Sequence, residues 1–319
     1  MGNEDQSRDS AHEQRRDVES SDAQSLPRAI QLSLARADRI LAPIILFAAV
    51  YLATFFLLRS VIPLVQWVGL LSGVVATAAT LAIIERGRWA LGFEQPLARG
   101  WQELLLGIGF GAILIAISDL LLRLSVTAPR VRGDGFPWIE LAAVYVPAAV
   151  HEELVFRGYV YQKIRSWRPG GAIAFTSLIF AALHAGNTGL TPLGLLNLTL
   201  GGVLLGLAYE WRRRLWMPIG LHLAWNLMSG PVLGYAVSGY LSEGSIFITM
   251  PVGSSALAGG AFGLEGTVWI SVAELLGIVA VLQLNRRGLE ENDASGKNAD
   301  ADRHVPSPAV VESGSTEKR

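Results

Sequence analysis

The sequence predicts an all-α, polytopic integral membrane protein of about eight transmembrane helices that enclose a polar cavity. The chain has 319 residues, of which 51% are hydrophobic and only 17% are charged. That apolar excess is above the level of ordinary soluble domains. The charged residues also gather in the first 39 and the last 35 residues, which leaves the middle of the chain nearly free of charge.

Successive apolar runs of membrane-crossing length give the expected helices. We expect spans at about 40–58, 61–84, 104–122, 136–161, 171–185, 190–209, 215–235 and 267–284. Together they form one transmembrane domain over 39–285. The polar segments 1–38 and 286–319 cannot bury a core and are expected to be disordered, cytoplasmic tails.

Composition also limits the function. A net charge of −1 gives no reason to expect nucleic acid as a partner. The chain has no cysteine, which excludes disulfides, thiolate nucleophiles and cysteine-ligated zinc. The N-terminal residues are acidic and serine-rich without a basic region, so we expect no cleaved signal peptide.

The charges between the spans predict the orientation, because Lys and Arg concentrate on the cytoplasmic side. With both termini in the cytoplasm of a multi-pass plasma-membrane protein, the inner segments would hold Arg28, Arg36, Arg39, Arg86, Arg88, Arg99, Lys163, Arg165, Arg168, Arg212, Arg213, Arg214, Arg286 and Arg287. The outer segments would hold only Arg59, Arg123, Arg130 and Arg132.

The fourth expected span carries ionisable residues inside an apolar run, Glu152, Glu153 and Arg157. Such residues at membrane depth are costly and usually functional. Glu153 and Arg157 are i,i+4 neighbours in the favourable order for an ion pair. Glu152 points about 100° away on a helix, so it is free for chemistry while Glu153 and Arg157 are structural.

Two later spans add polar faces, with His184 following Phe180 at i,i+4 and Asn226 following His222 at i,i+4. A bundle can bring these faces around one internal cavity, which we expect near the cytoplasmic half. There a glutamate and a neutral histidine can deprotonate a water. A His–Asn pair can donate to a developing oxyanion. This set suits hydrolysis of an amide by activated water.

A metal site is the competing interpretation of the same residues. One Glu and two His match some catalytic zinc sites in composition. However, a His-Glu-x-x-His motif starting at His151 would need a second histidine at Val155. We prefer the metal-free version, with no cofactor, because Asn226 has a role in it.

The pattern Glu152-Glu153-x-x-x-Arg157, Phe180-x-x-x-His184 and His222-x-x-x-Asn226 resembles the three motifs of the CPBP (Abi) intramembrane proteases, which include the CAAX prenyl endopeptidases. The resemblance covers roughly residues 135–235. It implies that Glu152 and His184 activate the water and that His222 and Asn226 form the oxyanion pocket.

By this resemblance the protein is an intramembrane endopeptidase. Its substrate would be a membrane-embedded or lipid-anchored peptide or protein. The alternatives are a zinc-dependent version of the same protease, or a non-catalytic transporter or immunity-type binding protein that kept the polar cavity. Among the remaining polar residues, His151 is expected to be a satisfied polar residue, Asp119 to be solvated near the outer end, and Glu274 has no evident partner.

Overall fold

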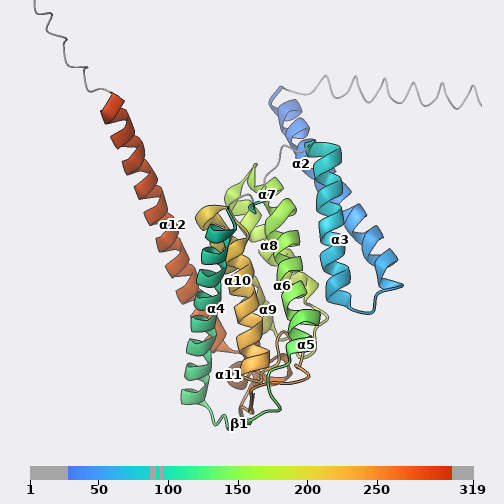
Figure 1. Cartoon of the computed structure of the whole chain (residues 1–319), viewed down its shortest axis with the longest axis vertical. Helices are drawn as coiled ribbons and strands as arrows, with labels where there is room; N and C mark the ends of the chain where they lie inside the picture. Colours follow the sequence, from blue (N-terminus) through green and yellow to red (C-terminus); the bar gives the residue numbers. More distant parts are fainter. Residues whose placement is uncertain (1–27, 87–90, 94–95, 304–319) are drawn as a thin grey trace, which may run out of the picture.

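The computed structural model describes residues 28–86, 91–93 and 96–303, with side chains described for 39–86, 91–93, 96–168 and 170–286. Helices make up nearly all of its regular structure, which confirms the predicted all-α fold (Figure 1). Within the described residues the one sheet pairs β1 (Arg130–Arg132) with β2 (Phe247–Thr249) antiparallel, with Val131 opposite Ile248.

Five helical segments of the described chain are long and apolar enough to cross a membrane. They are the 39–59 part of α2 (Arg28–Arg59), α3 (Val65–Thr80) with the π-helical turn η1 (Leu81–Glu85), α4 (Leu97–Ser125), α9 (Pro192–Arg212) and the 268–286 part of α12 (Val268–Arg303).

The remaining helical elements are shorter. They are α5 (Trp138–Glu140), η2 (Leu141–Tyr145), α6 (Val146–Glu153), η3 (Leu154–Tyr159), α7 (Val160–Arg165), α8 (Pro169–Leu183), α10 (Trp216–Leu227), η4 (Met228–Val232), α11 (Ser255–Ala258), η5 (Gly260–Phe262) and η6 (Leu264–Gly266). Each predicted span contains helix, and the count of eight crossings stays a prediction.

The predicted tails fall largely beyond these boundaries. Residues 1–27 and 304–319 lie outside the described residues, so their disorder stays a prediction. Helix α2 begins at Arg28 and α12 continues to Arg303, so both helices extend past the predicted limits of the transmembrane domain.

Local sequence signals set the ends of α9. Thr191 precedes the helix, and its hydroxyl accepts a hydrogen bond from the Gly194 amide at 3.1 Å, which caps one of the free N–H groups of the first turn. Pro192 follows as the first helical residue, where its missing N–H costs nothing. The helix ends at Arg212, and the next residue, Arg213, has a left-handed φ of 54°.

Glycines allow the central helices to approach closely. A Cβ atom at Gly107 of α4 would lie 2.2 Å from the Met217 carbonyl oxygen of α10, and one at Gly220 of α10 would lie 2.2 Å from the Leu104 carbonyl oxygen of α4. On α9, a Cβ at Gly202 would lie 2.8 Å from the Ser177 Cα of α8. Small residues at helix interfaces are the usual device for packing in membranes.

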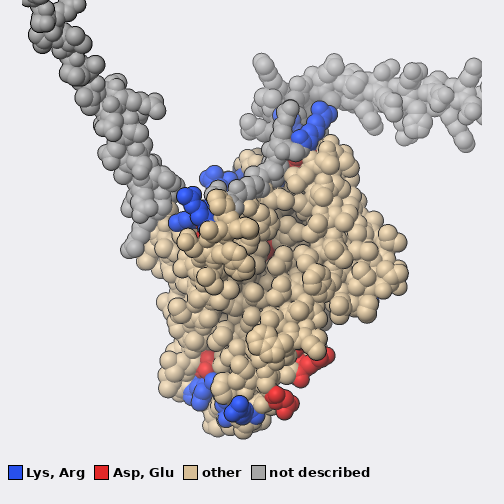
Figure 2. Space-filling model, in the orientation of Figure 1, with Lys and Arg blue, Asp and Glu red and all other residues tan. Residues whose placement is uncertain are grey.

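The side of the bundle carries few charged residues (Figure 2), and many large apolar side chains are exposed on its surface. Large hydrophobic side chains that are more than half exposed include Phe56 at 70%, Leu105 at 61% and Leu124 at 76%. Soluble monomers rarely expose contiguous apolar surface on this scale. The surface is therefore suited to lipid, as expected for a membrane protein.

The two ends of the bundle differ in structure. The first, here called the basic end, is where α3 and η1 end, α4 begins, α7 ends and α8 begins, and α9 ends. Ion pairs join these helix ends: Lys163–Glu85 at 2.5 Å, Arg165–Glu210 at 2.5 Å and Arg214–Glu103 at 2.9 Å. The opposite end, here called the loop end, contains the antiparallel β1–β2 pair and the long segment 233–267.

Candidate active site

The first motif lies on α6, between two π-helical turns. Turn η2 precedes it and turn η3 follows it, so the helix predicted over 136–161 is interrupted on both sides of Glu152 and Glu153. Gly158 within η3 has a ψ of −118°, outside the helical range. Each π turn holds an extra residue per turn, and such turns occur frequently at functional sites.

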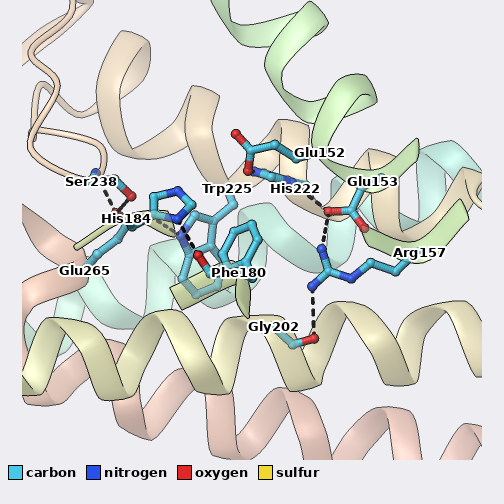
Figure 3. Close-up of polar contacts among 10 residues, drawn as sticks. All are labelled: Glu152, Glu153, Arg157, Phe180, His184, Gly202, His222, Trp225, Ser238 and Glu265. Carbon is cyan, nitrogen blue, oxygen red and sulfur yellow. Dashed lines mark hydrogen bonds and ion pairs between the residues drawn. The ribbon is translucent and has the colours of Figure 1, made fainter. Parts of the chain in front are cut away.

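Glu153 and Arg157 form a fully buried ion pair. The Arg157 Nη1 donates to Glu153 Oε1 at 2.9 Å, and both side chains are 0% exposed. The other Arg157 amino group donates to the Gly202 carbonyl oxygen of α9 at 3.0 Å. The contact expected at this spacing is present, and it connects α6 to η3 and α9 (Figure 3).

Glu152 has a different environment from its neighbour. Its side chain is 20% exposed, and its Oε2 lies 3.8 Å from His222 Nε2. That oxygen has no hydrogen-bond partner among the described residues. Figure 3 shows the Glu152 carboxylate directed away from the Glu153–Arg157 pair.

His222 forms a hydrogen bond with Glu153 and also faces Glu152. Its Nδ1 lies 2.8 Å from Glu153 Oε1. Because an ionised carboxylate can only accept, Nδ1 is the donor, and His222 Nε2 is left to face Glu152. Spacing within one helix could not predict this contact, which joins α10 to α6 across 69 residues of chain.

His184 is positioned by Phe180, its partner in the second motif. The histidine follows the last residue of α8, and its Nδ1 lies 2.7 Å from the Phe180 carbonyl oxygen. A carbonyl can only accept, so Nδ1 carries the hydrogen and Nε2 is an acceptor in the neutral ring. The Phe180 ring also lies 4.7 Å from the His184 ring and 6.2 Å from the His222 ring, measured between centroids.

One cavity of about 450 Å³ brings the predicted residues together. Glu152, His184, His222 and Asn226 all contribute to its lining. Asn226 is 8% exposed, and its side-chain amide has no hydrogen-bond partner within the described part of the chain. The ion pair that supports the first motif lies behind this wall rather than in it.

Polar residues that the sequence analysis did not select also line the cavity. Glu265 accepts from Trp225 Nε1 at 2.9 Å and from the amide and hydroxyl of Ser238, both at 2.6 Å (Figure 3). Glu274 of α12 is 2% exposed, and its Oε2 has no partner among the described residues. Glu265 belongs to the long segment between spans, where no helical spacing could indicate its contacts.

Tyr240 lies at the loop end of the same cavity. Its hydroxyl donates to Glu140 Oε1 at 2.7 Å. Burial, the hydrogen bond to Glu140 and the negative charge of Glu140 raise the pKa of the Tyr240 hydroxyl. The phenol therefore stays protonated at neutral pH and remains a donor.

Two other polar residues lie outside the cavity lining. The expectation that Asp119 is solvated is wrong, because Asp119 is 9% exposed, pairs with Arg130 and accepts from the Tyr235 hydroxyl at 2.7 Å. His151 accepts or donates a 2.7 Å hydrogen bond with the Tyr51 hydroxyl, and the two rings stack. Asp119 contacts β1 and the segment after η4, and His151 contacts α2.

A zinc site needs several ligands at one point. Glu152, His184 and His222 supply suitable donor atoms, but no three His, Asp or Glu side chains among the described residues lie close enough together to hold a metal ion.

A comparison with protein families finds one match. The family model described as type II CAAX prenyl endopeptidase, Rce1-like, matches residues 134–228. This segment is Rce1-like. It runs from just before α5 to the start of η4, so all three motifs lie within it, and the predicted resemblance is confirmed.

The Rce1-like segment supports a CAAX-type intramembrane protease, in keeping with the apolar helices around it. It suggests a prenylated or otherwise membrane-associated peptide as the substrate. Searches of the curated proteins and of the solved structures gave no match.

Proposed function

We propose that the protein is a metal-free intramembrane endopeptidase in which Glu152 is the general base. The observation that carries the proposal is the contrast between two adjacent carboxylates. Glu153 is 0% exposed, lies outside the cavity lining and is bonded through Oε1 to both Arg157 and His222, whereas Glu152 is 20% exposed and lines the cavity. Only Glu152 is therefore available to take a proton from a water.

The charges around His222 support its role as a donor. Two carboxylates, Glu152 and Glu153, lie against its ring, and Arg157 supplies one positive charge. A protonated His222 makes this buried group of four electrically neutral, and buried charges are tolerated when they are balanced and hydrogen-bonded. In that form Nε2 carries a hydrogen and can donate to a developing oxyanion.

The proposed reaction uses the four cavity residues in turn. A water hydrogen-bonded to Glu152 and to His184 Nε2 attacks the carbonyl carbon of the substrate as Glu152 takes its proton. His222 Nε2 and the Asn226 amide donate to the oxyanion that forms, which is the kind of preorganised stabilisation that often contributes most to catalysis. Glu152 then returns the proton to the departing amine, and the peptide bond is cleaved.

The substrate is proposed to be a membrane-embedded or lipid-anchored peptide. Both termini are proposed to be cytoplasmic in the plasma membrane, because Lys and Arg concentrate at the basic end. No cofactor takes part in the proposed step.

The test is cleavage of a quenched peptide library by the purified protein in detergent, beside the Glu152→Gln variant. Elemental analysis and chelator challenge accompany the assay. We expect cleavage that requires Glu152, persists with chelator and occurs without stoichiometric metal. Glu153 orients His222 in a way that would also suit a metal ligand, so the chelator arm is essential.

Each other result contradicts a specific part of the proposal. Cleavage lost with chelator and restored by zinc would make Glu152, His184 and His222 metal ligands. Equal cleavage by wild type and Glu152→Gln would remove Glu152 from the reaction. No cleavage of membrane-reconstituted substrates would favour a binding protein.

A further inference from the structure

Among the described residues, the lining of the cavity reaches one end of the bundle and not the other. Its lining runs from Glu152 and His222 in the middle to Pro63–Gln66, Ser238 and Tyr240 at the loop end. Leu64 and Val65, at the start of α3, are 47% and 46% exposed. The lining includes no residue from the basic end.

A packed core closes the cavity toward the basic end. Leu154, Tyr161, Tyr209, Leu215 and Ile219 form one hydrophobic cluster there, each no more than 6% exposed. The buried Glu153–Arg157 pair lies beside this cluster. A peptide therefore cannot reach Glu152 through the basic end without unfolding that core.

The same two ends differ in charge. Among the described side chains, the cations at or near the basic end are Arg39, Arg86, Arg99, Lys163, Arg165, Arg168, Arg212, Arg213, Arg214 and Arg286. Those at the loop end are Arg59, Arg123, Arg130 and Arg132, beside several acidic residues (Figure 2). The segment 236–266 has neither Lys nor Arg. The positive-inside rule places the basic end in the cytoplasm.

From the closed basic end and the charge asymmetry together, we infer that the substrate enters from the non-cytoplasmic side of the membrane. The inference rests on the proposed protease function and narrows its substrate class. The substrate is a peptide segment exposed on that side, next to a membrane span or a lipid anchor. The cavity was expected near the cytoplasmic half, but its lining runs from the middle of the bundle to the loop end and so lies toward the other face.

The lining also indicates the charge of the segment. It contains Glu152 and Glu265 but no Lys or Arg. An acidic side chain would meet like charges of low solvation, which disfavours it. The residues around the cleaved bond are therefore uncharged or basic.

Sealed membrane vesicles of opposite orientation test the direction of access. A membrane-impermeant quenched peptide, first shown to be cleaved in detergent, is added to right-side-out and to inverted vesicles that contain the wild-type protein. We expect right-side-out vesicles to cleave it and inverted vesicles to cleave it only after detergent is added. The reverse pattern would overturn the inference and leave the protease function standing, whereas absence of cleavage in detergent would count against the function itself.

Cysteine labelling tests the orientation without needing activity, because the chain has no cysteine of its own. Asp134→Cys at the loop end and Arg168→Cys at the basic end both replace exposed residues. A membrane-impermeant maleimide added to intact cells should label Asp134→Cys and spare Arg168→Cys. Labelling of Arg168→Cys alone would overturn the inference even if no substrate were found.

A third variant tests the mouth itself. Leu64→Cys lies in the cavity lining, so its modification by the impermeant maleimide on right-side-out vesicles should block cleavage. Modified Asp134→Cys, outside the lining, should cleave as before. Cleavage that survives full modification of Leu64→Cys would show that the substrate passes elsewhere.

Discussion

The carboxylates at the basic end and those in the cavity are held in opposite ways. At the basic end, Glu85, Glu103 and Glu210 each contact a Lys or Arg within 2.9 Å. In the cavity, Glu152 and Glu274 line a wall that contains no Lys or Arg. The glutamates at the basic end join helix ends through ion pairs, whereas the glutamates of the cavity direct carboxylate oxygen atoms toward a bound substrate.

This difference separates structural charge from reactive charge. A carboxylate at membrane depth that contacts no Lys or Arg is costly, so it persists where function requires it. Glu153 marks the boundary, because it contacts Arg157 on one side and the cavity residue His222 on the other. The comparison therefore predicts that neighbouring glutamates respond to substitution in different ways.

The largest effect is expected for Glu152→Gln. Cleavage should fall about 10²–10⁴-fold, the usual contribution of a general base, while the thermal unfolding midpoint in detergent stays near that of the wild type. The reason is that Glu152 accepts no bond from Lys or Arg. A variant with normal cleavage, or with a large loss of thermal stability, would place Glu152 among the structural charges.

Glu153→Gln should act mainly on stability. Removing one partner of a buried ion pair typically costs about 3–5 kcal/mol, here because Arg157 would keep its charge at 0% exposure. Thermal unfolding in detergent measures the loss. The matched control is the double variant Glu153→Gln with Arg157→Met, which should recover part of that stability. An unchanged thermal unfolding midpoint for Glu153→Gln would contradict the proposed difference between Glu152 and Glu153.

Asn226→Ala should reduce kcat with little change in KM. Loss of one oxyanion donor typically costs about 10²–10³ in kcat, and Asn226 has no other partner in the described structure to lose. Steady-state kinetics on the best peptide measure the change, and Asn226→Asp serves as the near-isosteric comparison. A rise in KM alone would assign Asn226 to substrate binding.

Arg212→Gln is expected to have the smallest effect. Arg212 is 48% exposed, and its partner Glu103 keeps the closer contact with Arg214. Exposed pairs contribute about 0–1 kcal/mol, so both the unfolding midpoint and cleavage should stay near wild-type values. A clear loss of cleavage would mean that the basic end influences the cavity.

The sequence predicted the fold well because lipid imposes a simple rule. A helix satisfies its own backbone hydrogen bonds, so long apolar runs in a membrane protein become helices. Hydropathy could not show the π turns on either side of Glu152 and Glu153, because an extra residue in a turn leaves the apolar composition unchanged.

The candidate site was predictable only in part. Spacing within a helix selected Glu152, His184, His222 and Asn226, which one cavity brings together. Contacts between helices have no such periodicity, so the His222–Glu153 bond was not predicted. The same holds for Glu265, which accepts from α10 and from the loop end at once.

The two π turns affect the rotation of the consecutive helical segments from α5 to α7 about their axis. One additional residue shifts everything beyond it by about 100° around the helix axis. The phase of α6, which aims Glu152 into the cavity, is thereby uncoupled from the phase of α7, which aims Lys163 and Arg165 at their acidic partners. Deleting one residue from η3 would rotate α7 relative to α6 by about 100°. The helical segment could then keep the ion pairs of Lys163 and Arg165 or the direction of Glu152 into the cavity, but not both.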